Sequence, residues 1–400
     1  MLLDRYTDAI AFMPGVVATG EELHVRGGRS GKMVVALSGV PLGDPQFGGA
    51  PEFPLFAVRA AELMTGPLDA DRAGTLAGEL DIQTEVPTAS PHLRARWLSD
   101  GRRFGGDDEA HLGFSGPLAR TGLGIAAAGE ARLDEMGMPD LRALGRKHVL
   151  GRSFGWRADN HVLGWLKLAP VDRVHAPSLE VPASRTVRAP YDPMFTYDGW
   201  VTYYDVQPTD PPGIPIILLT PLPLGSSSFR YRAADHVAMT DERRLAVVAQ
   251  ASRGGRVRVH GAAGWLHATS LTSVGLRPTS AGVSSDNLPV FGPYDQPGLD
   301  AFHAYAGDEP YFRSAGSTRL FARCDAAEAA GRKHSLRAGA GLAWETAKLE
   351  ELDVAAPRTP FVDSLRTYDA PALGGFAYVQ HRWEASGLIL NDGLRLQAFD

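Results

Sequence analysis

The segment Arg256–His260 reads RVRVH, and every second side chain in it is apolar. Successive side chains of a β-strand point to opposite faces, so this alternation predicts a strand with one apolar and one polar face. His92–Trp97 (HLRARW) has the same alternation, and Val201–Val206 and Phe376–Trp383 are rich in strand-favouring aromatic and β-branched residues. The 45 Gly and 29 Pro residues of the chain favour turns. These patterns predict a mainly β protein.

The two halves of the sequence contain similar segments. Gly31–Phe47 reads GKMVVALSGVPLGDPQF and aligns without a gap with Gly213–Phe229, which reads GIPIILLTPLPLGSSSF. Further along the chain, Gly145–Leu150 (GRKHVL) matches Gly331–Leu336 (GRKHSL). Similar segments in the same order and at a near-constant spacing indicate a duplicated unit.

The duplication predicts two tandem β-barrel or β-sandwich units, residues 1–193 and 194–400, joined in the proline-rich stretch Pro177–Pro193. Each unit is expected to carry one or two short helices, because several segments combine helix-forming residues with a cap or a following glycine. These segments are Pro139–Leu144, Asp325–Ala330, Phe56–Met64 and Ala234–Arg244.

Composition and charge exclude several classes of protein. The 400 residues carry a formal net charge of −6, which argues against a strongly basic nucleic-acid binder. The single cysteine excludes a disulfide framework and a cysteine-based metal site within one chain. The longest apolar run, Ile214–Leu224, is too short for a membrane helix, and Met1–Gly15 lacks the pattern of a signal peptide. We therefore predict a cytoplasmic protein without a membrane span, a nucleic-acid partner, a cofactor or a metal.

Two repeated polar motifs are candidate interaction sites. The GRKH motifs supply Arg146, Lys147 and His148 in the first half and Arg332, Lys333 and His334 in the second. Basic residues just after a helix stabilise its negatively polarised C-terminus. Alternatively, they bind an anion, to which arginine can donate two parallel hydrogen bonds. The RAA(D/E) motifs place Arg59 three residues before Glu62, and Arg232 three before Asp235, a spacing that pairs charges on a helix. We expect these residues at an interface or at an anion-binding surface.

Candidate acid–base residues are few. His236 follows Asp235, and His161 lies near Asp159, so these two pairs are the catalytic candidates. The sequence Gly151–Gly155 (GRSFG) fits the pattern of a serine nucleophile, but neither the strand nor the helix that should flank it is predicted. The histidines have no spacing typical of metal ligands.

Two functions from different classes fit these observations. The first is a structural or assembly protein, in which a duplicated β domain self-associates into a pseudo-symmetric ring, tube, hub or shell. The second is a lipocalin-like or β-barrel enzyme, an isomerase, cyclase or hydratase, that binds a small apolar molecule and uses His/Asp acid–base chemistry. The first is preferred because no catalytic constellation occurs in both halves.

Overall fold

The fold is that of a computed structural model. It describes residues 5–19, 22–28, 33–46, 49–65, 69–72, 78–99, 107–118, 121–134, 147–149, 152–154, 159–173, 176–190, 193–195, 197–204, 223–231, 236–283, 288–291, 304–331, 333–354, 364–385 and 387–400. None of the helices in these ranges is long and apolar enough to cross a membrane.

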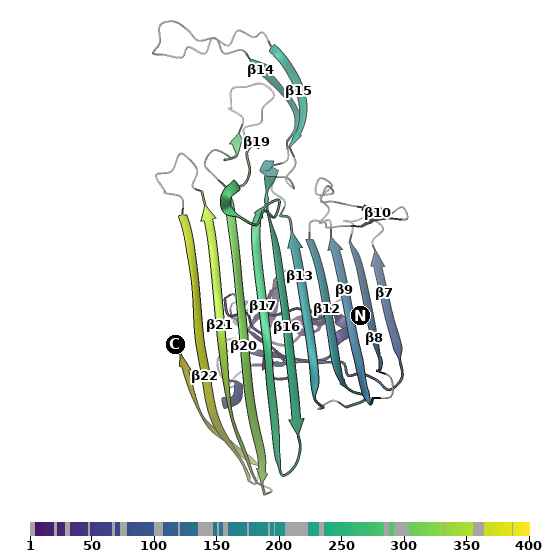
Figure 1. The fold of residues 1–400 in the computed structure, drawn as a ribbon, viewed down its shortest axis with the longest axis vertical. Coiled ribbons are helices and arrows are strands. Elements are labelled where there is room, and N and C mark those ends of the chain that lie inside the picture. The colour runs from purple at the N-terminus through teal and green to yellow at the C-terminus, as the bar shows by residue number, and fades with distance from the viewer. Residues whose placement is uncertain are drawn as a thin grey trace.

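The fold is mainly β, as predicted, and one antiparallel sheet of eleven strands dominates it (Figure 1). Strands that follow one another within this large sheet are also hydrogen-bonded neighbours, so the chain meanders from one edge to the other. In chain order the strands are β7 (His92–Ser99), β8 (Asp108–Pro117), β9 (Leu123–Asp134), β12 (Asp159–Pro170), β13 (Ser178–Arg188), β16 (Ala238–Arg253), β17 (Val257–Val274), β20 (Tyr311–Ala330), β21 (His334–Asp353), β22 (Ser364–Ala385) and β23 (Leu388–Phe399).

The connections differ between the two ends of the large sheet. At one end, which we call the turn end, the connections are short, and Gly331 and Gly387 adopt positive φ angles that glycine tolerates best. At the other, the loop end, they are mostly long, and several contain small elements. These elements are the hairpins β10 (Lys147–Val149)–β11 (Arg152–Phe154), β14 (Tyr197–Tyr204)–β15 (Pro223–Tyr231) and β18 (Val290–Phe291)–β19 (Ala304–Ala306), and the 3-10 turns η4 (Pro193–Phe195) and η5 (Ser280–Gly282).

An N-terminal unit, residues 5–91, lies against one face of the large sheet (Figure 1). Its core is a mixed four-stranded sheet in the order β4-β3-β6-β5, in which β3 runs parallel to β6. Ile10, Leu37 and Ile82 are fully buried there, and Trp165 and Leu266 of the large sheet complete the core. The elements are α1 (Tyr6–Ala11), β1 (Val16–Thr19), β2 (Glu22–Val25), β3 (Val34–Leu37), β4 (Val40–Pro41), η1 (Leu55–Ala57), β5 (Val58–Met64), η2 (Ala70–Arg72) and β6 (Glu79–Thr84).

The prediction of two duplicated units is wrong. Gly31–Phe47 contributes β3 and β4 to the mixed sheet, whereas the described end of Gly213–Phe229 belongs to the separate hairpin β14–β15. His148 lies in the small hairpin β10–β11, but His334 begins a strand of the large sheet. The large sheet also continues across the expected join, since β13 pairs with β16. The division into residues 1–193 and 194–400 stays a prediction. It concerns whether the two parts fold independently, which strand pairing by itself does not decide.

Three of the expected helices are strands or short turns. Asp325–Ala330 is the end of β20, although alanine and glutamate favour helices. Pairing with β17 on one side and β21 on the other overrides this local preference. Phe56–Met64 is mostly strand β5, and the described part of Ala234–Arg244 leads into β16. Pro139–Leu144 lies outside the described residues.

Candidate functional site

The two faces of the large sheet differ in chemistry. Side chains on the inner face contact the N-terminal unit and include buried charged residues such as Lys167 and Glu180. Because side chains alternate, the neighbours of these residues point outward. Leu342, Leu394 and Leu396 are outward residues with exposed fractions of 67%, 63% and 67%. The outer face of the large sheet therefore exposes apolar side chains, whereas its inner face carries buried charged side chains beside the apolar contact with the N-terminal unit.

Inner-face side chains of the large sheet hold the N-terminal unit by its backbone. Several of them, from strands at widely separated positions in the sheet, donate hydrogen bonds to carbonyl oxygens of the unit, among them Arg319 to Gly43 (3.5 Å). The others are Arg94 to Phe56 (3.1 Å), Gln250 to Leu37 (3.2 Å), Arg323 to Gly39 (2.8 Å) and Arg395 to Ala70 (3.1 Å). Such contacts are individually modest, about 0.5–1.5 kcal/mol each.

A buried polar cluster forms the tightest contact between the two parts. Thr84, at the end of β6, donates its hydroxyl to Glu180 Oε2 at 2.7 Å and accepts from Lys167 Nζ at 3.0 Å. Lys167 Nζ also lies 3.1 Å from Glu180 Oε1, and Trp165 Nε1 donates to Glu180 Oε2 at 3.2 Å. Every charge in the cluster is therefore matched, which a buried ion pair requires.

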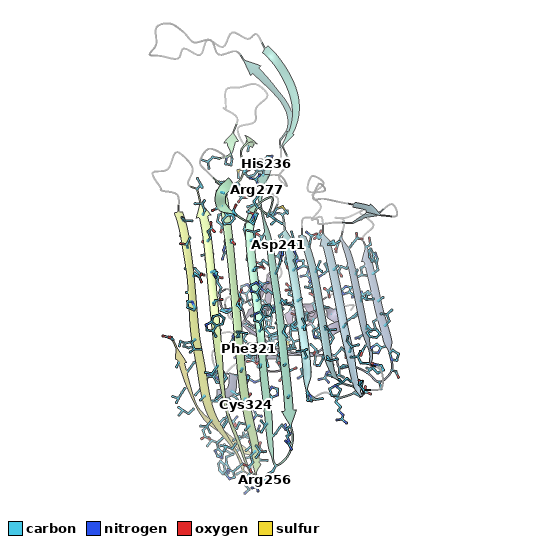
Figure 2. The ribbon with its side chains drawn as sticks, in the orientation of Figure 1. His236, Asp241, Arg256, Arg277, Phe321 and Cys324 are labelled. Atoms are coloured by element: carbon cyan, nitrogen blue, oxygen red, sulfur yellow. The ribbon has the colours of Figure 1, made fainter. Side chains whose placement is uncertain are left out.

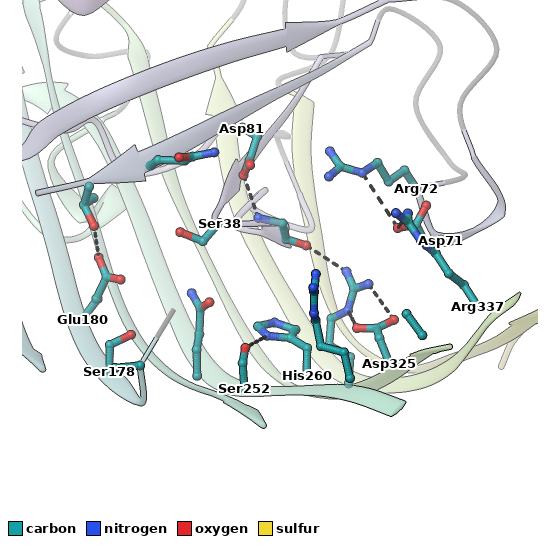
Figure 3. A pocket seen from close by; sticks show the side chains of 18 of the residues that line it. Ser38, Asp71, Arg72, Asp81, Ser178, Glu180, Ser252, His260, Asp325 and Arg337 are labelled. Atoms are coloured by element: carbon teal, nitrogen blue, oxygen red, sulfur yellow. Dashed lines mark hydrogen bonds and ion pairs between the residues drawn. The ribbon is translucent and has the colours of Figure 1, made fainter. Parts of the chain in front are cut away.

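A cavity of about 330 Å³ lies between the N-terminal unit and the turn-end half of the inner face (Figure 3). Arg323 crosses it, with two nitrogens 2.8 and 2.9 Å from the carboxylate of Asp325 and a third donating to Gly39. Tyr378 donates its hydroxyl to Asp325 at 2.7 Å. Cationic side chains outnumber carboxylates along the walls of the cavity. The cationic ones are Arg59, Arg72, Lys167, Arg258, Arg323 and Arg337, and the acidic ones are Asp71, Asp81, Glu180 and Asp325.

Two buried carboxylates of strand β6 belong to the same region. Asp81 accepts a hydrogen bond from the backbone of Gly39 at 2.6 Å, and Glu79 lies 2.9 Å from Arg72 Nη1. Burial raises the pKa of Glu79, an effect that Arg72 opposes and Asp81 reinforces. Burial also raises the pKa of Asp81, although the hydrogen bond from Gly39 opposes that shift.

A second cavity, of about 390 Å³, lies on the loop-end side of the N-terminal unit. Its charged lining comes from both parts of the molecule: Arg5, Glu52, Glu130, Arg132, Arg188, Glu242 and Arg244. Arg132 Nε lies 3.0 Å from Glu130, and Arg244 Nη2 lies 3.1 Å from Glu242. Tyr6 also lines this cavity, and burial raises the pKa of its hydroxyl, which therefore stays protonated. The N-terminal unit thus separates two polar cavities.

The candidate catalytic residues do not meet in one site. His161 Nε2 lies 3.1 Å from Asp159 on the inner face, so the side chains of this pair are in contact. His236 lies at the loop end (Figure 2), where its Nδ1 is 2.8 Å from Asp308. Asp235 lies outside the described residues.

The repeated motifs are also dispersed. Arg59 and Glu62 lie on strand β5, not on a helix, and Arg59 donates to Gln83 at 2.8 Å. Lys333 and His334 lie at the turn end of the large sheet. Arg146, Arg232 and Arg332 lie outside the described residues. Lys147 and His148 are described by their backbone only.

Sequence reasoning missed most of the residues at the interface. Arg319, Arg323 and Asp325 share the inner face of β20 because they are separated by even numbers of positions. A strand with charged side chains on one face and apolar residues such as Leu320 on the other was visible in the sequence. The alternation did not reveal that the charged face is the buried one.

Comparison with known proteins identifies the fold of the chain. No protein-family model and no curated relative matches the chain. Solved structures do match it, among them the siderophore receptor PirA of Pseudomonas aeruginosa (13% identity, 100% of this chain, 53% of that chain, TM-score 0.56). The copper transporter OprC matches with 14% identity over 98% of this chain and 53% of that chain, at a TM-score of 0.56. The outer membrane transporter YddB of Escherichia coli matches with 9% identity over 99% of this chain and 54% of that chain, also at a TM-score of 0.56. The chain shares the fold of outer-membrane transporters. It spans about half the length of these structures.

These matches overturn the predicted function and location. Neither a cytoplasmic structural assembly nor a lipocalin-like or β-barrel enzyme agrees with neighbours that are receptors and transporters. The predictions of self-association and of no membrane span are contradicted by the same neighbours. The physical reason is that a search for long apolar runs detects helices, whereas a strand in contact with lipid needs an apolar residue only at every second position.

Proposed function

We propose that the protein is an outer-membrane transporter or receptor. In this proposal the large sheet forms part of the wall of a membrane-spanning barrel, and the N-terminal unit occludes the lumen of that barrel. The observation that carries this proposal is the reversal of polarity between the two faces of the large sheet. A protein in water places its apolar sheet face inside, whereas a membrane barrel places it outside and keeps a polar interior.

The dimensions of the apolar face fit a bilayer. On β16 the outward residues between Arg243 and Arg253 are Leu245, Val247, Ala249 and Ala251. Arg243 and Arg253 are ten positions apart, which is about 34 Å at roughly 3.4 Å per residue. With the tilt of about 40° that such strands adopt, this span has a height of about 26 Å, close to the roughly 25 Å band of outer-membrane barrels.

Charged groups mark both borders of this band. At the loop end, Asp241 accepts from Arg185 at 2.8 Å and from Arg243 at 2.7 Å on the outward face. At the turn end, Arg256 pairs with Glu328 at 2.9 Å (Figure 2). Outer-membrane barrels have short periplasmic turns and longer extracellular loops, so we assign the loop end to the cell exterior.

The two cavities suggest a route for the ligand. The loop-end cavity would receive it, and displacement of the N-terminal unit would connect that cavity with the one at the turn end. Barrels large enough to form an open channel carry such plugs in the outer-membrane transporters. The hydrogen bonds from large-sheet side chains to the unit's backbone fit an occluding element that must move without unfolding.

The ligand we propose is an anionic metal chelate. Two of the neighbours named above are a siderophore receptor and a copper transporter, which supports a metal-containing cargo. Arg5, Arg132, Arg188 and Arg244 line the loop-end cavity together with three glutamates, so guanidinium groups that can donate to an anionic ligand are present there.

The test is binding and fractionation of the full chain. We expect the protein in the outer-membrane fraction, and we expect a ferric siderophore from a panel of anionic chelates to quench its tryptophan fluorescence. Arg188→Gln with Arg244→Gln should weaken that binding at least about tenfold, since each lost charge-assisted contact contributes about 1.5–3 kcal/mol. Arg253→Gln, at the turn end of the outward face, is the control and should bind like the wild type. A protein that stays out of the membrane fraction would disprove the proposal.

A further inference from the structure

Three polar side chains line up across adjacent strands at the turn end of the outward face. His334 begins β21, His381 lies on β22, and Asp392 on β23 is the register partner of His381. His334 pairs in register with Trp383, which places it diagonally next to His381. His334 is exposed, and the side chain of His381 is 36% exposed, so this His–His–Asp cluster is open to water.

The hydrogen bonds of the cluster fix its protons. His381 Nδ1 lies 3.1 Å from Asp392 Oδ1, and a carboxylate only accepts, so Nδ1 of His381 carries a proton. In the neutral ring Nε2 of His381 then presents a lone pair. His334 Nδ1 lies 2.9 Å from that lone pair, and the two ring planes are within 16° of parallel. A single proton therefore separates two ring nitrogens that point at each other.

We propose that this cluster is a binding site for a divalent transition metal ion, with His334 Nδ1 and His381 Nε2 as its ligands. Imidazole nitrogen is a preferred ligand of Zn²⁺ and Cu²⁺, and both ligand atoms are already aimed at one point. To bind, neutral His334 moves its proton from Nδ1 to Nε2, and the two rings move apart to admit the ion. No net proton is released when both rings are neutral, whereas protonated rings must first lose a proton to solvent.

Asp392 acts as a positioning residue. A carboxylate that accepts from the far nitrogen of a ligating histidine orients the ring and raises its basicity, and this arrangement recurs in metal sites. Within the described ranges, no group of three or more His, Cys, Asp or Glu side chains is placed to hold a metal. Water molecules therefore complete the coordination, and the site is of moderate affinity with open positions.

The metal ion would join strands at the edge of the described sheet. It bridges β21 and β22 directly, and it holds β23 through the hydrogen bond between His381 and Asp392. Binding to the folded state alone raises the free energy of unfolding as the ion concentration exceeds the dissociation constant. This inference rests on the geometry of the cluster and not on the proposed transport function, because neither cavity includes these residues.

The test is titration of the full chain, made without a histidine tag and stripped of metal, with CuCl₂ and then ZnCl₂. We expect about one Cu²⁺ per chain, bound more tightly than Zn²⁺ as the Irving–Williams order requires. Electron paramagnetic resonance of the Cu²⁺ form should show two coordinated imidazole nitrogens. His334→Gln and His381→Gln should each lower the affinity at least tenfold and leave one imidazole in the spectrum.

Two further variants complete the experiment. Asp392→Ala should weaken binding about 10–100-fold with both imidazoles still coordinated, the typical effect of removing an orienting partner. His92→Gln alters an exposed histidine that contacts Thr88 at 3.2 Å, and it should change neither stoichiometry nor spectrum. Circular dichroism checks that every variant keeps its β structure. An unchanged two-nitrogen spectrum in a folded His334→Gln/His381→Gln double variant would overturn the proposal.

Discussion

Thr84 of the N-terminal unit and Glu180 of the large sheet share a hydrogen bond of 2.7 Å, in a place where both side chains are almost completely buried. Their positions in the chain differ by 96 residues. Together with Lys167, they form a buried polar contact between the two parts of the molecule. This contact depends strongly on the exact position of its groups, because a buried charge without a partner is strongly unfavourable.

Lys167→Met should loosen the N-terminal unit. The substitution leaves the carboxylate of Glu180 buried without its cationic partner, which destabilises the contact by about 3–5 kcal/mol. Limited proteolysis of the N-terminal unit in the folded protein measures the effect, and the cleavage rate should rise by more than tenfold. Lys348→Met is the matched control, because Lys348 and Asp369 form an exposed pair of the kind that contributes at most about 1 kcal/mol. Equal cleavage rates for the two variants would contradict this account.

The stability of the N-terminal unit should fall as the pH rises. Burial raises the folded-state pKa of Glu79 and of Asp81, so each carboxyl binds its proton more tightly when folded. Their contribution is therefore fully present below the unfolded pKa values near 4 and is lost as the pH rises through the raised folded values. Limited proteolysis at a series of pH values measures this dependence, and Glu79→Gln should reduce the slope of stability against pH above about pH 4. Glu384→Gln, on β22, should keep the wild-type slope.

Leu342→Arg should prevent assembly in the membrane. Leu342 is 67% exposed on the outward face, and an arginine at the midplane of a bilayer destabilises a barrel by about 2–4 kcal/mol. The adjacent Ala343 faces the inside, in a recess that Glu345 and Arg319 also line, so Ala343→Arg should assemble normally. Heat-modifiable migration on gels measures assembly of both variants. If Ala343→Arg failed and Leu342→Arg assembled, the assignment of the two faces would be reversed.

Gly339→Ala should disturb the turn-end cavity. A Cβ atom at this position would lie 2.5 Å from Asp325 Oδ1 and 2.6 Å from a ring carbon of Tyr378, both closer than real contacts allow. Displacing these groups breaks their hydrogen bond and overpacks the wall, which together destabilise by about 1–3 kcal/mol. Gly316→Ala is the control, since its nearest contact would be an ordinary 3.8 Å. Thermal unfolding should separate the two variants, and equal midpoints would refute the clash.

Much of the strand content could be predicted from the sequence. RVRVH lies in β17 except for Arg256, which precedes it, HLRARW lies in β7 and Phe376–Trp383 lies in β22, because alternation and β-branched or aromatic residues act locally. Local rules failed where long-range pairing overrides them, as in Asp325–Ala330, whose helix-forming residues extend β20. The similarity of Gly31–Phe47 to Gly213–Phe229 was also misleading, because similar apolar runs entered different sheets.

The candidate site depended on tertiary structure almost entirely. Thr84, Lys167 and Glu180 come from three strands, and no spacing in the sequence relates them. The sequence by itself determined that strands form and that each has a polar and an apolar face, because the backbone alternates at every residue. Only the tertiary structure decided which face turns inward, because that depends on the N-terminal unit packing against the charged side of the large sheet and leaving the apolar side exposed.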